Sequence, residues 1–263
     1  MSYVLAGIGT NPTLGNALAF KGGTALKKVY FDNYRFSEDL DFTLVGTVDS
    51  QRIETDIGDA VGRAQTMARA YSPIEMSVRK KIHKAPHPRG QQDFIVDVTF
   101  PWHPRSLCPV KVEITRDEPL LLPAVRHPIL HGYSGEVLDA SIAVYAIEEI
   151  IAEKLRTILQ AHERIKQRQW VTRRGRDYFD LWRLLTDPSM DVKETLIPSL
   201  LMRKVAVRNV SYRSPDDFFP KELLDDARRH WTTSLAALVP ELPPFDHVIT
   251  DLRRRLEELK LVD

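Results

Sequence analysis

The stretch FKGGTALKKVYFDNYRFSEDLDF, residues Phe20–Phe42, decides the fold of this chain. It opens on the glycine pair Gly22 and Gly23 and closes on the carboxylate pair Asp39 and Asp41. Glycines carry no β-carbon, so a phosphate can approach the backbone of such a turn closely. Carboxylates two residues apart on a strand project to the same side, where they can bind one hard cation such as Mg²⁺. Each half alone is commoner as a plain turn or a solvated strand edge, but the combination predicts a nucleotide site.

The residues between these two pairs predict a short helix followed by a strand. Thr24–Tyr30 can place its apolar residues on one face, and its first turn offers free N–H groups to an anion. Leu40–Val45 alternates apolar and polar residues, which is the period of a strand. Arg35 and Ser37 precede this strand and add a cation and a hydroxyl within reach of phosphate oxygens. Both are therefore candidates for binding the same phosphate groups.

The runs KGGTALKKVY and RFSEDLDF resemble the first motif of the AbiEii/AbiGii-type, MenT-like nucleotidyltransferase toxins. This family belongs to the DNA polymerase β-like nucleotidyltransferase superfamily, whose members pair a Gly-Gly or Gly-Ser turn with Asp-x-Asp. In this chain the turn is Gly22-Gly23-Thr24, so any role of the usual serine falls to Thr24. The resemblance implies a metal-dependent nucleotidyltransferase that uses an NTP.

The composition is that of an ordinary soluble domain, with 43% apolar and 28% charged residues among 263. The formal net charge of +1 means that a nucleic-acid partner would have to bind a local patch. The single cysteine, Cys108, excludes an internal disulfide and fits a reducing compartment. The N-terminus does not read as a signal peptide, and no apolar run approaches the ~20 residues that span a bilayer. We therefore expect a cytoplasmic protein.

A third carboxylate is expected on a strand that neighbours the Asp pair, because it can bind a metal or accept a proton. The candidates are Glu113 and Asp97, in the predicted strands 110–116 and 93–100. We favour Glu113 because VKVEIT resembles the corresponding strand of the family. Read without the family, Glu113 is a half-buried strand residue paired with a cation. The pattern also predicts a helix over 49–70, a strand around 74–78 and a loop over 84–92.

The chain is expected to change from strands to helices near Gly135, after the proline-rich segment Glu118–Gly135. Ser141–Gln167 reads as one long helix whose apolar stripe includes Lys154. A lysine in such a stripe must snorkel, pair with a buried carboxylate or point into a cleft. The run AIEEIIAEKLRTIL is similar to the second family motif, which implies that Lys154 neutralises triphosphate charge in the nucleotide site.

The next predicted helix, Arg176–Leu185, places Asp177 and Asp180 side by side. It resembles the third family motif, whose aspartate is needed for activity, and which of the two carries that role stays open. The alternative is an acidic helix cap and a partner for Arg183. A basic connector precedes the helix and is a candidate RNA contact or simply a solvated segment; it comprises Lys166, Arg168, Arg173, Arg174 and Arg176, with Trp170 among them. The remaining residues predict amphipathic packing helices over 221–239 and 245–261.

We therefore predict an α+β fold, with an N-terminal nucleotidyltransferase-fold mixed sheet flanked by helices (residues 1–135) and a C-terminal helical domain (136–263) that completes the nucleotide site. The expected metal is Mg²⁺ or Mn²⁺. The resemblance implies transfer of NMP from an NTP, with CTP a candidate, to the 3′ end of tRNA, and control by a cognate antitoxin. Transfer to a protein hydroxyl, phosphoryl transfer and a non-catalytic nucleotide- or RNA-binding module are the alternatives. The metal ligands implied are Asp39, Asp41 and Glu113; the nucleotide-binding residues are Gly22, Gly23, Thr24, Arg35, Ser37 and Lys154; Asp177 and Asp180 complete the catalytic set.

Overall fold

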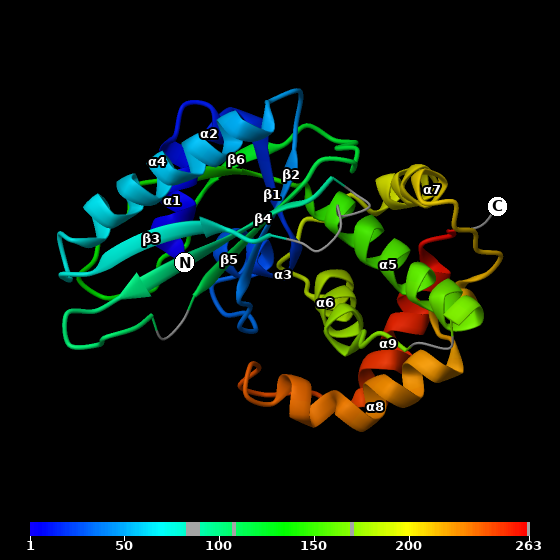
Figure 1. The fold of residues 1–263 in the computed structure, drawn as a ribbon. Helices are drawn as coiled ribbons and strands as arrows, with labels where there is room; N and C mark the ends of the chain where they lie inside the picture. The colour runs from blue at the N-terminus through cyan, green and yellow to red at the C-terminus, as the bar shows by residue number, and fades with distance from the viewer. Residues whose placement is uncertain (83–89, 107–108, 169–170, 262–263) are drawn as a thin grey trace. The chain divides into compact units, whose positions relative to one another are not determined.

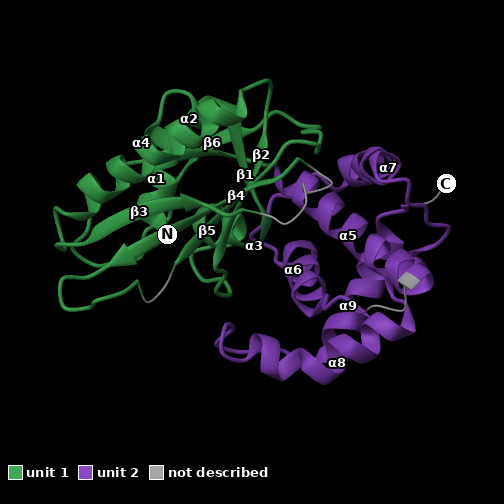
Figure 2. Ribbon diagram, in the orientation of Figure 1, with its two compact units in different colours: residues 1–145 green, residues 146–263 purple. Residues whose placement is uncertain are grey.

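The computed structural model describes residues 1–82, 90–106, 109–168 and 171–261 (Figure 1). Cys108 and Trp170, and most of the loop predicted over 84–92, lie outside these ranges. The chain divides into two compact units, residues 1–145 and 146–263 (Figure 2). Among the described residues, no helix is both long and apolar enough to cross a membrane.

The first unit is built on a seven-stranded sheet in the order β3-β4-β5-β2-β1-β7-β6 (Figure 1). The pairs β2–β5 and β1–β7 are parallel and the other pairs are antiparallel, which confirms the predicted mixed sheet. Its elements in chain order are α1 (Ser2–Thr10), α2 (Leu14–Ala17), β1 (Leu18–Lys21), α3 (Gly22–Ala25), the π-helical turn η1 (Leu26–Tyr30), β2 (Asp39–Leu44), α4 (Ser50–Ala68), β3 (Glu75–Lys80), β4 (Gln92–Thr99), β5 (Val110–Thr115), β6 (Val125–Pro128) and β7 (Ser141–Val144).

The two faces of this sheet differ because each strand alternates apolar and polar residues. One face packs against α1 and α4 in a single hydrophobic core, to which β2 contributes Leu40 and Phe42, both fully buried. The intervening residues of β2, Asp39 and Asp41, belong to the opposite face. The sheet therefore places the predicted carboxylates on the side away from the helices that cover the core.

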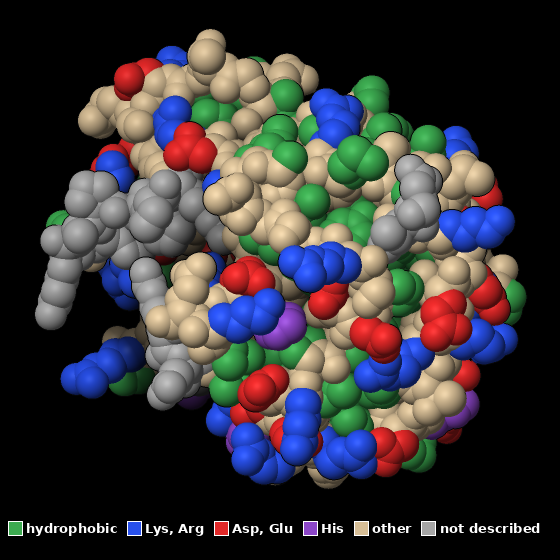
Figure 3. Space-filling view, turned by 90° about the vertical axis from the view of Figure 1, so that its right-hand side faces the viewer, with side chains coloured by type: hydrophobic (Ala, Val, Ile, Leu, Met, Phe, Trp, Pro, Cys, Tyr) green, Lys and Arg blue, Asp and Glu red, His purple; other side chains and the backbone are tan. Residues whose placement is uncertain are grey.

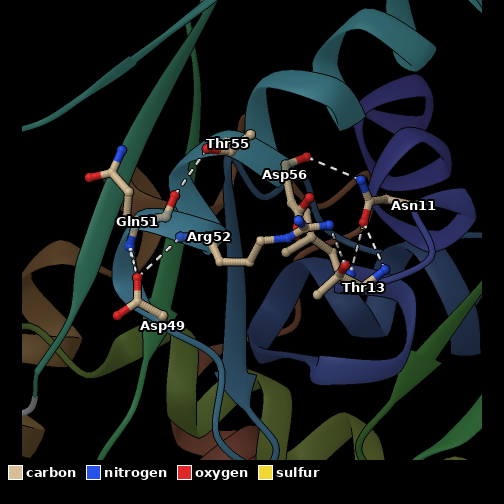
Figure 4. A network of polar contacts seen from close by, with 8 residues as sticks. Asn11, Thr13, Asp49, Gln51, Arg52, Thr55 and Asp56 are labelled. Atoms are coloured by element: carbon tan, nitrogen blue, oxygen red, sulfur yellow. Dashed lines mark hydrogen bonds and ion pairs between the residues drawn. The ribbon is translucent and has the colours of Figure 1, made fainter.

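Helix α4 starts where the sequence predicts, and a polar network fixes its first turns (Figure 4). Asp49 caps the helix by accepting hydrogen bonds from the backbone N–H groups of Gln51 and Arg52. The guanidinium of Arg52 donates to Asp56 at 2.8 Å, and the side chain of Asn11 donates to the carbonyl of Asp56. This network connects α4 to the loop between α1 and α2, so the helices that cover the sheet are held together at one end.

The predicted helix over Ser141–Gln167 is wrong at its beginning, because Ser141–Val144 forms the strand β7. This strand pairs with β1 in parallel and with β6 in an antiparallel ladder, and its Ile142 and Val144 are fully buried. Burial on one face of a sheet overrides the helical pattern that follows it. The strand β6 also lies within the proline-rich segment Glu118–Gly135. Because β7 completes the sheet, the first unit extends to Tyr145, beyond the predicted change near Gly135.

The second unit is helical, as predicted. Helix α5 packs against α6 and α7, and α6 packs against α8 and α9. On the face shown in Figure 3, Lys and Arg side chains are interspersed with Asp and Glu side chains, in keeping with the near balance of 37 basic and 36 acidic residues. The elements are α5 (Ile147–Arg168), α6 (Gly175–Thr186), η2 (Glu194–Leu196), α7 (Ile197–Val207), η3 (Pro215–Phe218), α8 (Lys221–Leu235) and α9 (Phe245–Glu258).

Candidate active site

The glycine turn is packed against the residues that follow it in the motif. Gly22 has a φ of +78°, and a β-carbon added there would lie 2.6 Å from Oδ2 of Asp41. A β-carbon added at Gly23 would lie 2.3 Å from Nη2 of Arg35. Gly22 is therefore required by its left-handed backbone and by Asp41, whereas a β-carbon at Gly23 would displace the end of the Arg35 side chain. Thr24 is fully buried and donates its hydroxyl to the carbonyl of Asp39 at 2.5 Å.

A row of charged residues crosses the polar face of the sheet. The ladder places Lys21 on β1 opposite Asp41 on β2, and Asp41 opposite Glu113 on the parallel strand β5. Glu113 in turn lies opposite Asp93 on β4. Because register partners project to the same side of a sheet, these side chains form one row, which we call the acidic row: Asp41, Glu113 and Asp93, with Lys21 at its end. Asp93 is a further carboxylate of this site.

The acidic row concentrates negative charge, and the surrounding side chains respond to it. Burial, followed by the charges of Asp93 and Asp39, raises the pKa of Glu113. The side-chain amide of Gln91 donates to Asp93 at 2.7 Å and to Glu113 at 3.0 Å, so one amide holds both carboxylates. A carboxylate with a raised pKa is a better proton acceptor than an ordinary one.

Asp39 is two residues before Asp41 in β2, so its side chain projects from the same face of the sheet, next to the acidic row. Its Oδ1 lies 3.3 Å from Nζ of Lys111 but makes no hydrogen bond, although the oxygen is buried. The charge of Asp39 is the main cause that raises the pKa of Lys111. Asp39 thus presents a buried oxygen that can accept a further ligand.

The donor set fits a divalent cation chemically. Asp39, Asp41 and Glu113 offer only carboxylate oxygens, the hard ligands that Mg²⁺ and Mn²⁺ prefer. The buried Oδ1 of Asp39 without a hydrogen bond and the raised pKa of Glu113 are both what a missing positive charge would relieve. In the described part of the chain, no three His, Cys, Asp or Glu side chains are already closed into a metal-binding group. A cation would therefore require these side chains to rotate toward one another.

The other candidates of the first unit lie in different surroundings. The guanidinium of Arg35 is buried against Gly23 and donates to the carbonyl of Phe36 at 3.2 Å. Ser37 is half-buried in the segment that leads into β2. Asp97 forms an ion pair with Arg79 at 3.1 Å, and its position on β4 lies beyond the last register pair with β5. Glu113, and not Asp97, is therefore the carboxylate opposite Asp41.

The second unit brings together the lysine and both aspartates predicted from the sequence. Nζ of Lys154 on α5 lies 3.0 Å from Oδ1 of Asp177 and 2.6 Å from Oδ2 of Asp180, both on α6. Of the three arrangements open to Lys154, the structure has the pairing with buried carboxylates. Arg174 donates to the other oxygen of Asp177 at 3.1 Å, and Arg183 forms an ion pair with Asp187 at 2.9 Å.

Electrostatics in this cluster favour the charged forms. Burial acts to raise the pKa of Asp177, but the cations Lys154 and Arg174 outweigh it, and the pKa is lowered. The side chain of Asp180 is fully buried, whereas that of Asp177 is 17% exposed. Asp177 is thus the carboxylate that solvent reaches, and Asp180 is the internal partner that fixes the ammonium.

The basic connector is partly engaged in local ion pairs. Arg174 pairs with Asp177, and Lys166 pairs with Glu163 at 2.9 Å. Trp170, which the sequence places among these cations, lies outside the described residues. Through the ion pair between Arg174 and Asp177, the connector is linked to the carboxylate that also binds Lys154.

Sequence reasoning missed Lys21, Gln91, Asp93 and Arg174 as neighbours of the predicted residues. Lys21 adjoins Gly22 directly, so its position in the motif could have singled it out. The approach of Gln91 and Asp93 to Glu113 depends on the register of the β4–β5 ladder, for which the sequence carries no local signal.

Comparisons with known proteins identify the family and a similar fold. Residues 4–251 match the family described as "Nucleotidyl transferase AbiEii toxin, Type IV TA system". The fold is similar to that of MenT4, a nucleotidyltransferase toxin from Mycobacterium tuberculosis, with a TM-score of 0.63 and 22% sequence identity. That likeness covers 100% of this chain and 82% of MenT4. No curated protein matches the chain.

Proposed function

The chain belongs to the AbiEii family of nucleotidyltransferase toxins of type IV toxin–antitoxin systems, and we propose that it transfers NMP from an NTP to the 3′ end of tRNA and so blocks translation. The observation that carries the proposal is the packing of the glycine turn against Asp41, next to Glu113 on the neighbouring strand. This is a phosphate-binding turn joined to carboxylates that can bind a divalent cation.

The first unit supplies the metal ligands of the proposed reaction. Asp39, Asp41 and Glu113 would hold Mg²⁺ or Mn²⁺. When bound, the cation supplies charge neutralisation at the phosphoryl oxygens of the NTP. The backbone at Gly22, Gly23 and Thr24 would bind the triphosphate together with Arg35 and Ser37, through N–H groups, a guanidinium and a hydroxyl.

The chemical step is an exchange of one phosphorus–oxygen bond for another. The acceptor hydroxyl oxygen attacks the α-phosphorus, the bond from that phosphorus to the bridging oxygen breaks, and pyrophosphate leaves. The hydroxyl proton goes to a carboxylate, and Glu113, opposite Asp41 on the neighbouring strand, either accepts this proton or completes the metal site. The rest of the catalysis is positioning and charge neutralisation.

For the second unit we propose a role in neutralising the triphosphate through Lys154. Asp177 and Asp180 hold its ammonium in one place, which makes them positioning residues for the lysine. Lys154→Met should then raise KM for the NTP, and an unchanged KM would remove this role.

The deciding experiment uses α-³²P-labelled CTP, UTP, ATP and GTP, each incubated separately with the purified protein, tRNA and Mg²⁺. We expect label on the 3′ end of tRNA from one pyrimidine nucleotide, with CTP the first candidate. Asp41→Asn should abolish the labelling while its thermal unfolding stays close to that of the wild type. Total cell protein is offered in a parallel reaction, and label that appears only in protein would overturn the tRNA acceptor.

The proposed setting is the bacterial cytoplasm, with a cognate antitoxin as the partner. Expression of the wild type should then arrest growth, and Asp39→Asn should relieve the arrest. An Asp39→Asn variant that is as toxic as the wild type would contradict nucleotide transfer as the basis of toxicity and favour a non-catalytic binding module.

A further inference from the structure

Lys21 is a charged residue of the polar sheet face to which no role has been assigned. It is the last residue of β1 and directly precedes the glycine turn. Only 9% of the residue is exposed, so most of the side chain lies inside the fold. Lysines are rarely buried unless their charge is paired or used.

The ladder fixes which neighbours Lys21 has. Its register partner is Asp41, so the lysine stands at the end of the acidic row, beside the carboxylate that packs against Gly22. A side chain on the last residue of a strand is positioned by the sheet, whereas one on a loop is not. The sheet therefore keeps a cation next to the turn that is proposed to bind phosphate.

The aromatic ring of Tyr145 is a second neighbour of the Lys21 ammonium. Nζ of Lys21 lies 5.7 Å from the centroid of the Tyr145 ring, which is within the range of a cation–π contact. The tyrosine is fully buried; its hydroxyl donates to Oγ1 of Thr43 at 2.7 Å, and its backbone N–H donates to the carbonyl of Phe20 at 3.0 Å. The buried ring of Tyr145 and the register partner Asp41 are therefore both neighbours of Lys21.

The negative charge of the acidic row would repel the phosphates of a nucleotide, and a nearby cation would reduce this repulsion. A nucleoside triphosphate brings several negative charges to a face that already carries Asp39, Asp41, Glu113 and Asp93. A fixed cation beside the glycine turn offsets the repulsion on the side of the row away from Glu113.

We propose that Lys21 binds the β- or γ-phosphate of the nucleotide and acts as a phosphate-binding residue of the first unit. This inference rests on the proposed function for its ligand class, a nucleoside triphosphate. It needs neither the tRNA acceptor nor any particular base. Because the interaction is with the phosphates released as pyrophosphate, it should discriminate a triphosphate from a monophosphate.

The test measures binding by calorimetry in the presence of Mg²⁺, without any acceptor. The probes are CTP, CMP and inorganic tripolyphosphate, which reports the phosphates without a base. Lys21→Met should weaken the binding of tripolyphosphate and CTP about tenfold or more and leave CMP within about twofold, because a charge-assisted contact to phosphate is lost. Lys21→Arg should retain part of the affinity for tripolyphosphate, since it keeps the charge.

Lys27→Met is the matched control, because Lys27 lies in the same stretch but its ammonium donates to the carbonyl of Tyr34 and lies over the ring of Phe36. If Lys21→Met weakens the binding of CTP and CMP equally, or leaves the affinity for tripolyphosphate unchanged, the proposed role of Lys21 is wrong. If Lys21→Met fails to fold, the ratio of CTP to CMP affinity in Lys21→Arg decides, and a ratio equal to that of the wild type counts against the proposal. If the wild type binds tripolyphosphate through Lys21 but labels no tRNA, the proposed tRNA acceptor is rejected and the proposed role of Lys21 in binding phosphate is retained.

Discussion

The carboxylate of Asp41 occupies the space where a side chain at Gly22 would begin, since an added β-carbon would lie 2.6 Å from its Oδ2. The turn and the carboxylate strand are therefore one packed unit rather than two motifs that happen to be near in sequence. Any residue larger than glycine at this position must displace the carboxylate, and a φ of +78° adds backbone strain.

Gly22→Ala should consequently lose both stability and nucleotide transfer. The left-handed backbone alone costs about 1 kcal/mol for alanine, and the clash with Asp41 should bring the total to about 2–3 kcal/mol. Gly46→Ala is the matched control, because Gly46 has a φ of +83° but no atom within 4 Å of an added β-carbon. Urea unfolding and transfer assays on both variants measure the difference. Equal losses of stability and full activity in Gly22→Ala would show that the Asp41 contact does not matter.

The sequence predicts this packed unit because both parts lie within one short stretch and their roles follow from local chemistry. It does not predict the partners that come from the ladder. Asp93 and Asp97 occur in one strand and project to the same face, so period alone cannot distinguish them. Only the β4–β5 register places Asp93 opposite Glu113 and leaves Asp97 to Arg79.

The misread strand β7 has a similar cause. Ser141–Val144 is short and directly precedes a long helix, so its four residues add to the apparent helical pattern. Its strand state depends on β1, which lies more than a hundred residues earlier in the sequence and offers an unpaired edge. Interactions of this kind are non-local, and single-sequence patterns carry no trace of them.

Glu113→Gln should change stability and activity in opposite directions. The folded chain raises the pKa of Glu113 through burial and the charges of Asp93 and Asp39, so ionisation of this carboxyl favours unfolding. Its contribution to stability is therefore lost as the pH rises from about 4, the unfolded value, through the raised folded pKa. The amide removes this cost, and we expect a higher free energy of unfolding at pH 7 together with loss of nucleotide transfer.

Thermal unfolding with and without Mg²⁺ checks the same variant for its proposed role in metal binding. A cation that binds only the folded protein raises the melting temperature of the wild type. The rise should be smaller in Glu113→Gln and should not occur in a variant with both Asp39→Asn and Asp41→Asn. A Glu113→Gln protein that is less stable than the wild type at pH 7, or that responds equally to Mg²⁺, would contradict this interpretation of the carboxylate.

The effect of pH on the contribution of Asp177 to stability should be opposite to that of Glu113. Lys154 and Arg174 overcome the effect of burial and lower its pKa, so its stabilisation is present above the unfolded value near 4 and is lost as the pH falls through the folded pKa. We expect Asp177→Asn to cost about 2 kcal/mol at pH 7, with the gap to the wild type closing below about pH 4. Asp225→Asn, at an exposed position on α8, serves as the control in the same denaturant titrations. A gap that does not depend on pH would exclude the charge of Asp177 as its source.

Glu149 on α5 and Lys204 on α7 form an ion pair in which Nζ of the lysine lies 2.8 Å from Oε1 of the glutamate. Both side chains are fully buried. A buried pair costs desolvation free energy that its attraction only partly offsets, while removing one partner leaves the other charge stranded. Lys204→Met alone should therefore cost about 3–5 kcal/mol, as should Glu149→Leu alone. The double variant should recover most of this loss, because both charges then leave the interior. Urea titrations of the four proteins give the coupling free energy. Additive losses in the double variant would mean that the two side chains are stabilised independently, by their other neighbours. Because α5 also carries Lys154, recovery of the fold with unchanged transfer activity would separate the structural ion pair of this helix from its proposed catalytic lysine.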